Sequence, residues 1–452
     1  MLFGKRHKIQ FIYNYLFFVL LFIGTLQVYM SEVFQYNSWV TGSNLAIVLL
    51  SLLFMFLGDS YSFSLNKIVM LFSFFFFGIA PILQYQKGIV LWGGASFSSS
   101  DYIGMNMLVI FILFLYQGSY YLFSRLRMNN LELRVARYKK EEKLVISRER
   151  LLALACFSVL VTLYMNKFNL LNLLLRSGQK VTTEQALMLV YSNFVRPIPI
   201  VCLLIAKQHE IGGRLYRFLL VTLVVITNFP TASARFYVAA TYLPLLLVYV
   251  PFLSKRYMAL NKLMILGLLI VFPFLDQMRN ITRLSDIKLS LDFSMFTTGH
   301  FDSYQMFLRV MVEDVVTYGR QLLTAFLFFV PRSWWPGKSV GSGHLMAELA
   351  GLSFTNISMN YFGEGYINFG YLGIFLFATL LALINARFDK IYWTRAEKSS
   401  PLSAIYFLLL GLEFFILRGD LLSSFAFTVG LCSSVAFVYA ISSRSRQKKA
   451  DL

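Results

Sequence analysis

The sequence predicts an all-α integral membrane protein with about twelve membrane-spanning helices. Its 452 residues are 58% hydrophobic and only 14% charged, with a mean hydropathy of +0.64, whereas an average soluble domain has about 25% charged residues. Apolar runs of spanning length also recur along the whole chain, since about 20 helical residues cross about 30 Å of hydrocarbon. No soluble domain is left between these runs, so we expect a single polytopic domain, 1–452.

Twelve apolar stretches make up the predicted spans, and the shortest are 217–231 and 262–276. No small-residue cleavage site follows the first stretch, so we expect it to remain as a span rather than to be removed as a signal peptide. The stretches are 11–30, 40–57, 67–85, 103–124, 151–168, 187–206, 217–231, 235–253, 262–276, 359–385, 402–417 and 420–441.

The positive charges predict the orientation of these spans. Nine of the 41 lysines and arginines lie in 125–150. If the N-terminus is cytoplasmic, every predicted cytoplasmic loop carries lysine or arginine, as the positive-inside rule requires. We therefore expect both termini in the cytoplasm and 125–150 as a basic cytoplasmic loop. The net charge of +19 then reflects topology rather than nucleic-acid binding, although contact of 125–150 with anionic lipid headgroups stays open.

Cysteine and histidine usage predicts neither a disulfide framework nor a metal site. Cys156, Cys202 and Cys432 all fall within apolar runs, where cysteine behaves as a small hydrophobic residue. The four histidines show no spacing typical of metal ligands. We expect no metal and no other cofactor.

The segment 277–358 separates the ninth and tenth spans and is the largest predicted outer loop. Within it Phe307, Val310, Met311 and Val315 recur at helical spacing, and Asp302 or Ser303 is a suitable cap for that helix. The part 320–330 is apolar enough to dip into the membrane without crossing it. We expect a structured loop with short or re-entrant helices, and ordered loops of this length are usually functional.

Arginines outside the cytoplasmic loops are the first candidates for a binding site. Guanidinium groups bind phosphate oxygens bidentately and stay charged when desolvated. Arg196 is the most distinctive, because it lies inside a span beside Pro197, where an ionisable group is costly. The candidates are Arg176, Arg196, Arg235, Arg279, Arg283, Arg332 and Arg418.

Structural ion pairs are the alternative for several arginines. Arg309 has Glu313 four residues ahead on a predicted helix, and Arg320 has Glu313 and Asp314 nearby. Arg283 has Asp276 or Asp286 as a partner, and Arg418 has Asp420.

The run NYFGEGYINFGYLG at 360–373 is the second candidate. On a helix Tyr361, Glu364, Asn368 and Tyr371 share one polar face, and the four glycines of the run allow another backbone or a substrate to approach closely. A carboxylate at the rim of a span can act as a general base for a sugar hydroxyl. The alternative for Glu364 is a salt bridge to one of the arginines.

The run PRSWWPGKSVGSGH at 331–344 can neither span a bilayer nor form a long helix. Its prolines fix the path of the chain, and its glycines let the backbone approach a ligand. Trp334 and Trp335 belong either to the aromatic belt of the membrane interface or to a platform that stacks on a sugar ring. His344 is a second candidate base, and His300 is a weaker one.

Together these features resemble the Wzy-type O-antigen polymerases, within the broader group of oligosaccharide repeat-unit polymerases. The resemblance covers the architecture of the whole chain, and in sequence it rests on the PRxxWPxK element and the GExxxNFGxxG run between 331 and 373, with a weaker similarity at TASAR. It implies a GT-C-like membrane fold. It also implies transfer of a growing glycan from undecaprenyl pyrophosphate to a sugar hydroxyl of a lipid-linked repeat unit at the periplasmic face of the bacterial inner membrane, without metal or nucleotide sugar.

The resemblance turns the candidates into expected roles. The seven arginines bind the pyrophosphate, Glu364 or His344 is the catalytic base, and the sugar is bound by Trp334, Trp335, Tyr361 and Asn368. Expected partners are undecaprenyl-pyrophosphate-linked oligosaccharides, the bilayer and a chain-length regulator. The related ligases, which transfer the glycan to lipid A core, and lipid-linked oligosaccharide flippases are the alternatives; the long outer loop favours an enzyme over a transporter, whose loops are short.

Overall fold

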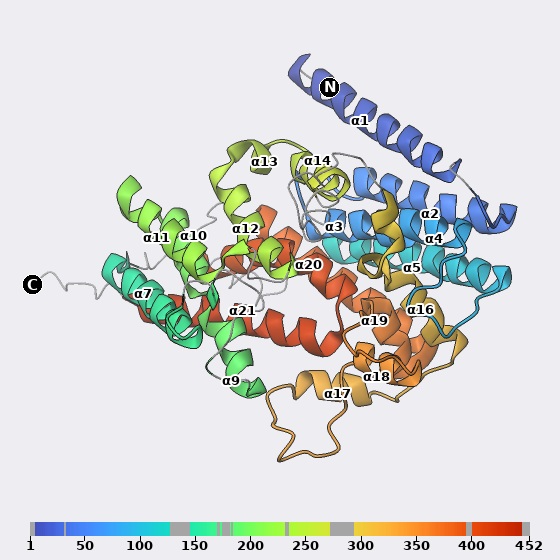
Figure 1. Cartoon of the computed structure of the whole chain (residues 1–452). Helices are drawn as coiled ribbons and strands as arrows, with labels where there is room; N and C mark the ends of the chain where they lie inside the picture. Colours follow the sequence, from blue (N-terminus) through green and yellow to red (C-terminus); the bar gives the residue numbers. More distant parts are fainter. Residues whose placement is uncertain are drawn as a thin grey trace, which may run out of the picture.

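The computed structural model describes residues 5–30, 33–126, 145–169, 172–173, 181, 184–230, 235–271, 293–394 and 400–444, and these residues are almost entirely helical (Figure 1). The first part of the chain forms long apolar helices, with α1 at the edge of the molecule. Its elements are α1 (Lys5–Tyr29), α2 (Ser38–Leu57), α3 (Leu65–Phe72), the π-helical turn η1 (Ser73–Ile79), α4 (Ala80–Gln86) and α5 (Ser99–Arg125).

The middle of the chain forms shorter helices. One predicted span, 187–206, is broken by a π-helical turn followed by Pro197. The elements are α7 (Arg148–Met165), α9 (Gln185–Val190), η2 (Tyr191–Val195), α10 (Ile198–Gln208), α11 (Arg214–Thr227), α12 (Arg235–Tyr249), α13 (Pro251–Lys255), α14 (Ala259–Leu266) and η4 (Gly267–Val271).

The last part contains a group of short helices followed by three long ones. Residues 293–360, which we call the cap, hold the short helices. The elements are η6 (Phe293–Thr297), η7 (Gly299–Phe301), α16 (Ser303–Val312), α17 (Arg320–Phe326), α18 (Ser342–Leu349), α19 (Tyr361–Thr394), α20 (Pro401–Arg418) and α21 (Leu421–Ser442). Two short strands, β1 (Val145–Ile146) and β2 (Ser443–Arg444), pair antiparallel.

Hydrogen bonds between distant segments place the helix ends at two opposite ends of the bundle. The end that carries the cap, here the capped end, joins the residue pairs Tyr29–Gln86, Tyr85–Ser99, Gln84–Phe296 and Gly299–Arg418. The opposite end joins Ser62–Lys255, Phe63–Trp393, Ser124–Lys390 and Ser147–Ser442. Helices α5, α19, α20 and α21 therefore each run from one end to the other, as spanning helices do.

Eight helices are long and apolar enough to cross a membrane, among the residues described. They coincide with eight of the twelve predicted spans, and the multi-pass membrane class is confirmed. The other four stretches are also helical, but α11, α12 and α14 with η4 are short, and α7 has charged residues in its first turn. Twelve spans therefore remain a prediction.

Three buried apolar clusters hold the bundle together. The largest lies between α2, α3 to α4, α5, α16 and α19. A second joins α7, α10, α11 and α21 to α20, and the third ties the loop before α3 to α19 and α20. The segment from α3 to α4 is buried along its entire length, which explains its phenylalanine run: Phe72, Phe74, Phe75 and Phe77 fill the centre of the bundle.

Candidate functional site

The polar residues of 360–368 each bind a different part of the cap. Asn360 precedes α19, and its side-chain oxygen accepts hydrogen bonds from the backbone N–H groups of Phe362 (3.0 Å) and Gly363 (2.8 Å), which are unpaired donors at a helix start. Its Nδ2 donates to the carbonyl of Ser303 at 2.7 Å. Asn360 thus begins α19 and attaches α16 to it.

Glu364, in the first turn of α19, is fully buried. One carboxylate oxygen accepts from Ser342 Oγ at 2.7 Å and the other from the backbone N–H of Leu421 at 2.8 Å. These contacts join the beginnings of α18, α19 and α21. Glu364 forms no ion pair with an arginine among the residues that the structure describes.

Asn368 attaches α17 in the same way. Its Oδ1 accepts from the N–H of Leu322 at 2.8 Å, and its carbonyl accepts from the N–H of Gly319 at 2.8 Å. This carbonyl is available because α19 breaks after Asn368: Phe369 and Gly370 leave the helical conformation, Gly370 with φ +61°. The sugar-binding role predicted for Asn368 is untested, but its hydrogen bonds are structural.

The break corrects the predicted polar face of 361–371. Tyr361, Glu364 and Asn368 are buried on one helix, as expected, whereas Tyr371 lies beyond the break and is 65% exposed. The expected close approach by glycine is present, since a Cβ on Gly373 would lie 1.8 Å from the carbonyl oxygen of Gly365. The two halves of the broken helix meet at these glycines.

Arg418, at the end of α20, is held by the cap. Its Nη2 donates to Asp302 Oδ1 at 3.1 Å and to the carbonyl of Gly299 at 2.8 Å. Asp302 is fully buried and also accepts from Trp92 Nε1 at 3.0 Å and from the Ser358 hydroxyl. The partner of Arg418 is thus Asp302 rather than Asp420. Asp302 does precede α16, but its side chain binds these groups instead of capping the helix.

The guanidinium of Arg418 retains donor capacity toward a ligand. Its side chain is 34% exposed, and its buried Nε has no hydrogen-bond partner in the described part of the chain. A buried unpaired donor is costly unless a ligand or water binds it.

Asp420 lies in the turn between α20 and α21. Its carboxylate accepts from the backbone N–H of Gly343 at 3.0 Å and of Ser423 at 3.2 Å. Burial raises the pKa of Asp420, and these N–H groups, which bind the charged form, offset part of that rise. The turn therefore contacts the cap at two points, Arg418 with Asp302 and Asp420 with α18, and its Leu421 N–H binds Glu364 at the start of α19.

Two exposed arginines bind backbone carbonyls of the loop between α17 and α18. Arg332, a predicted pyrophosphate ligand, donates to the carbonyls of Lys338 at 2.6 Å and Ser339 at 3.0 Å. Arg320 donates to the carbonyl of Gly337 at 3.0 Å, so the predicted pairing of Arg320 with Glu313 or Asp314 is wrong, whereas Arg309 does lie 3.9 Å from Glu313.

The aromatic and histidine candidates of this region are accessible. Trp334 is 82% exposed and Trp335 is partly buried. His344 lies one turn into α18 and contacts Glu348 through Nε2 at 3.0 Å, on an exposed face. Of the two predicted bases, His344 is therefore accessible and Glu364 is not.

Arg196 lies at the break between η2 and α10. Its Nε donates to the carbonyl of Thr227 at 2.8 Å, at the end of α11, and its guanidinium lies 4.8 Å from the ring centroid of Tyr237. Tyr237 is two residues into α12, which begins at Arg235. The structure therefore brings Arg196 close to the first turn of α12, as a shared site for Arg196 and Arg235 requires.

The structure does not describe the side chains of four predicted arginines. Arg176, Arg279 and Arg283 lie outside the described residues, as does all of 272–292. Arg235 is described only as the first residue of α12. A gathering of all seven arginines at one site is consequently untested.

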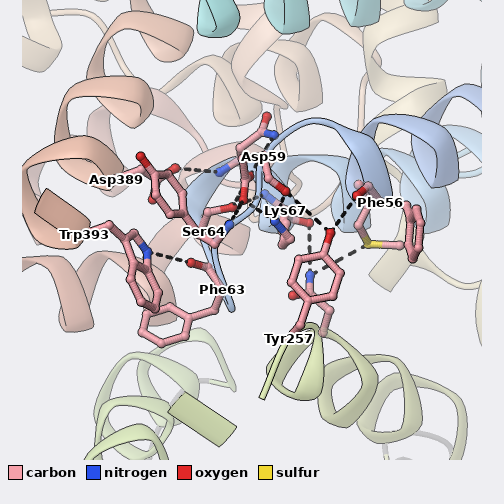
Figure 2. Close-up of polar contacts among 12 residues, drawn as sticks. Phe56, Asp59, Phe63, Ser64, Lys67, Tyr257, Asp389 and Trp393 are labelled. Atoms are coloured by element: carbon pink, nitrogen blue, oxygen red, sulfur yellow. Dashed lines mark hydrogen bonds and ion pairs between the residues drawn. The ribbon is translucent and has the colours of Figure 1, made fainter. Parts of the chain in front are cut away.

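A second polar cluster, at the opposite end, was not predicted from the sequence (Figure 2). Lys67 is fully buried at the start of α3 and forms an ion pair with Asp59. Figure 2 shows Lys67, Asp59 and Ser64 pointing toward one another, with Tyr257 beside them; Asp59 also accepts from Ser64 Oγ at 2.7 Å. The pair fixes the loop between α2 and α3.

Asp389, near the end of α19, completes this cluster. Its two oxygens accept from the backbone N–H groups of Leu65 (2.9 Å) and Asn66 (3.3 Å) and from the hydroxyls of Tyr406 (2.5 Å) and Tyr120 (2.8 Å). The carboxylate thus satisfies the first donors of α3 and joins it to α5, α19 and α20. The available signal was Lys67 within a predicted span, where ionisable residues are rarely accidental.

The residues described contain no group of histidine, cysteine, aspartate and glutamate that could hold a metal ion. The fold and the two polar ends define a multi-pass helical membrane protein with a folded cap at one end. No protein-family model, curated protein or solved structure matches the chain.

Proposed function

We propose that this protein is an integral-membrane glycosyltransferase that polymerises undecaprenyl-pyrophosphate-linked O-antigen repeat units, with a GT-C-like fold and the capped end at the periplasmic face of the inner membrane. The orientation is supported by the charges, because the basic segment 125–150 follows the end of α5 that lies at the opposite end.

The observation that carries the proposal is Arg196. A charged side chain within a span, at a point where the helix is broken, is typical of substrate sites in membrane proteins. At this break Arg196 contacts the end of α11 and the start of α12. An arginine in this position is suited to bind a pyrophosphate.

The reaction requires stabilisation of the leaving group and a base for the acceptor hydroxyl. The bond between the anomeric carbon and the pyrophosphate breaks, and arginines stabilise the charge that develops on the leaving group. A base removes the proton of the acceptor hydroxyl, which attacks the anomeric carbon from the opposite face with inversion. His344 is the more accessible base, whereas Glu364 would need α18 to move away.

Substitution of Arg196 tests the proposal. Arg196→Gln removes the charge and should abolish polymerisation, and Arg196→Lys, which keeps the charge but not the planar fork, should restore it only in part. Arg256→Gln at the opposite end, where the exposed guanidinium lies over the ring of Phe252, is the matched control. The readout is the length distribution of O-antigen after complementation of a deletion strain, at equal protein levels. Normal chain lengths with Arg196→Gln would refute a role in binding the donor.

The two candidate bases can be compared in the same assay. His344→Gln should abolish polymerisation while the protein stays folded. Glu364→Gln should lower the free energy of unfolding by less than about 1 kcal/mol, because its Oε1 can still accept from the Leu421 N–H while its Nε2 donates to Ser342 Oγ. It should retain polymerisation if His344 is the base. Full activity of His344→Gln would leave Glu364 as the base.

A further inference from the structure

The connection from α17 to the start of α18 extends away from the body of the molecule at the capped end (Figure 1). We call α17 and the first part of this connection, together residues 320–336, the wedge. Its side chains are turned outward: Trp334 is 82% and Phe329 67% exposed, and Leu323 and Phe326 on α17 are about half exposed. Large apolar side chains gathered on one projecting element mark a contact surface rather than a solvated loop.

Several backbone carbonyls of the wedge are paired by a side chain of the same loop. Lys338 lies in the same loop, two residues after the wedge. It is buried and donates through Nζ to the carbonyls of Leu327 (3.0 Å), Phe328 (2.7 Å) and Val330 (2.8 Å). Desolvation lowers the pKa of Lys338, which agrees with an ammonium group removed from water.

Further hydrogen bonds pair backbone groups within the wedge and directly after it. Arg332 and Arg320 bind the carbonyls of residues 337–339, and the N–H groups of Trp334 and Trp335 bind the carbonyl of Pro331. A loop in water would leave these carbonyls to the solvent. Backbone polar groups paired inside the segment are a requirement for lipid contact.

The wedge is continuous with surfaces that face lipid. Phe326 and Phe328 pack on Phe425 of the spanning helix α21, with ring centroids 5.2 Å and 6.3 Å apart. At its other side, the hydrogen bond from Gly319 to Asn368 places the start of α17 where the exposed apolar face of α19 begins with Tyr371 and Leu372.

We propose that the wedge inserts into the interfacial region of the bilayer at the capped end, with Phe329 and Trp334 as its membrane anchors. Tryptophan favours this depth, because its ring is buried among apolar groups while its N–H stays hydrated, and phenylalanine adds apolar area to such interfacial contacts. The inference is independent of the proposed enzymatic function, because it rests on exposure, backbone pairing and the packing of the wedge against α21.

Spin labelling in proteoliposomes tests the wedge. Nitroxides are placed at Phe329→Cys and Trp334→Cys, in a chain with Cys156, Cys202 and Cys432 replaced by alanine. The control is Ser96→Cys, an exposed position in another loop of the capped end. At the wedge positions, the ratio of collisions with oxygen to collisions with a water-soluble nickel chelate should be severalfold higher than at Ser96. Equal ratios at all three positions would overturn the proposal.

Two further outcomes are informative. Spin–spin broadening at Phe329 that disappears on dilution with unlabelled protein would mean that a second copy covers the wedge, and this also overturns the proposal.

If the cysteine-free chain fails to fold, tryptophan fluorescence of the native chain is the measurement. Lipids brominated near the headgroup should quench wild type more than Trp334→Phe, and equal quenching would contradict insertion.

Discussion

Replacement of Asp389 by asparagine tests the polar cluster at the opposite end. Both carboxylate oxygens of Asp389 face a fixed backbone donor, the N–H of Leu65 at 2.9 Å and that of Asn66 at 3.3 Å. In Asp389→Asn one oxygen becomes an N–H₂ group, which cannot accept. One backbone N–H at the start of α3 is then left buried without an acceptor.

The cost can be estimated from general values. The variant loses one charge-assisted hydrogen bond, worth about 1.5–3 kcal/mol, and leaves a buried donor unsatisfied, at about 1–3 kcal/mol. Because these terms overlap, we expect a loss of about 3 kcal/mol in the free energy of unfolding. That corresponds to a fall of about 3–6 °C in melting temperature, allowing for the size of the chain.

Glu413→Gln is the matched control. Glu413 is equally buried, but its single described hydrogen bond comes from the side-chain amide of Asn385, at 2.8 Å. Glutamine keeps an oxygen for that bond, so the expected loss is below about 1 kcal/mol. Both variants are measured by thermal unfolding in detergent. Equal melting temperatures for the two variants would refute the assignment of Asp389 as the acceptor that fixes α3.

Three further predictions concern the capped end. Gly373→Ala should prevent correct folding, because the added Cβ would lie 1.8 Å from the carbonyl oxygen of Gly365, whereas Gly118→Ala, with open space around it, should leave expression and melting temperature unchanged. Because burial raises the pKa of Asp420, stability relative to Asp420→Asn should be greatest below about pH 4, where the carboxyl is protonated in both the folded and the unfolded state, and it should decline as pH rises through the folded-state pKa. A difference in melting temperature that stays constant from acid to neutral pH would contradict this. Lys338→Met removes three hydrogen bonds to carbonyls and should increase protease cleavage between α17 and α18, and unchanged cleavage would mean that the loop is held by other contacts.

Hydropathy and charge were sufficient to predict the membrane class and the positions of the helices, because both depend on local composition. Hydropathy and charge did not predict the breaks within helices. The face shared by Tyr361, Glu364, Asn368 and Tyr371 follows the helical period, but α19 breaks at Phe369 and Gly370. The cause is tertiary, since Gly319 and Thr317 bind the carbonyls that the break releases.

In the candidate site, too, the sequence indicated the residues but not their partners. The sequence identified the residues 360–373 as important, and the structure shows that Asn360, Glu364 and Asn368 attach three separate helices of the cap. Which helices they attach could not be inferred, because the partners are distant in sequence. The contact of Asp389 with Leu65 spans 324 positions, and nothing in the local pattern around either residue indicates the other.

The lipopolysaccharide of a strain that lacks this protein tests the central claim most directly. Deletion of the gene in its own host, followed by gel electrophoresis of the lipopolysaccharide, separates the candidate functions. A polymerase predicts that the long ladder disappears and that core carrying a single repeat unit remains, with the ladder restored by wild type. Core without any repeat unit would instead indicate a ligase or a flippase, and an unchanged ladder would contradict any role in O-antigen assembly.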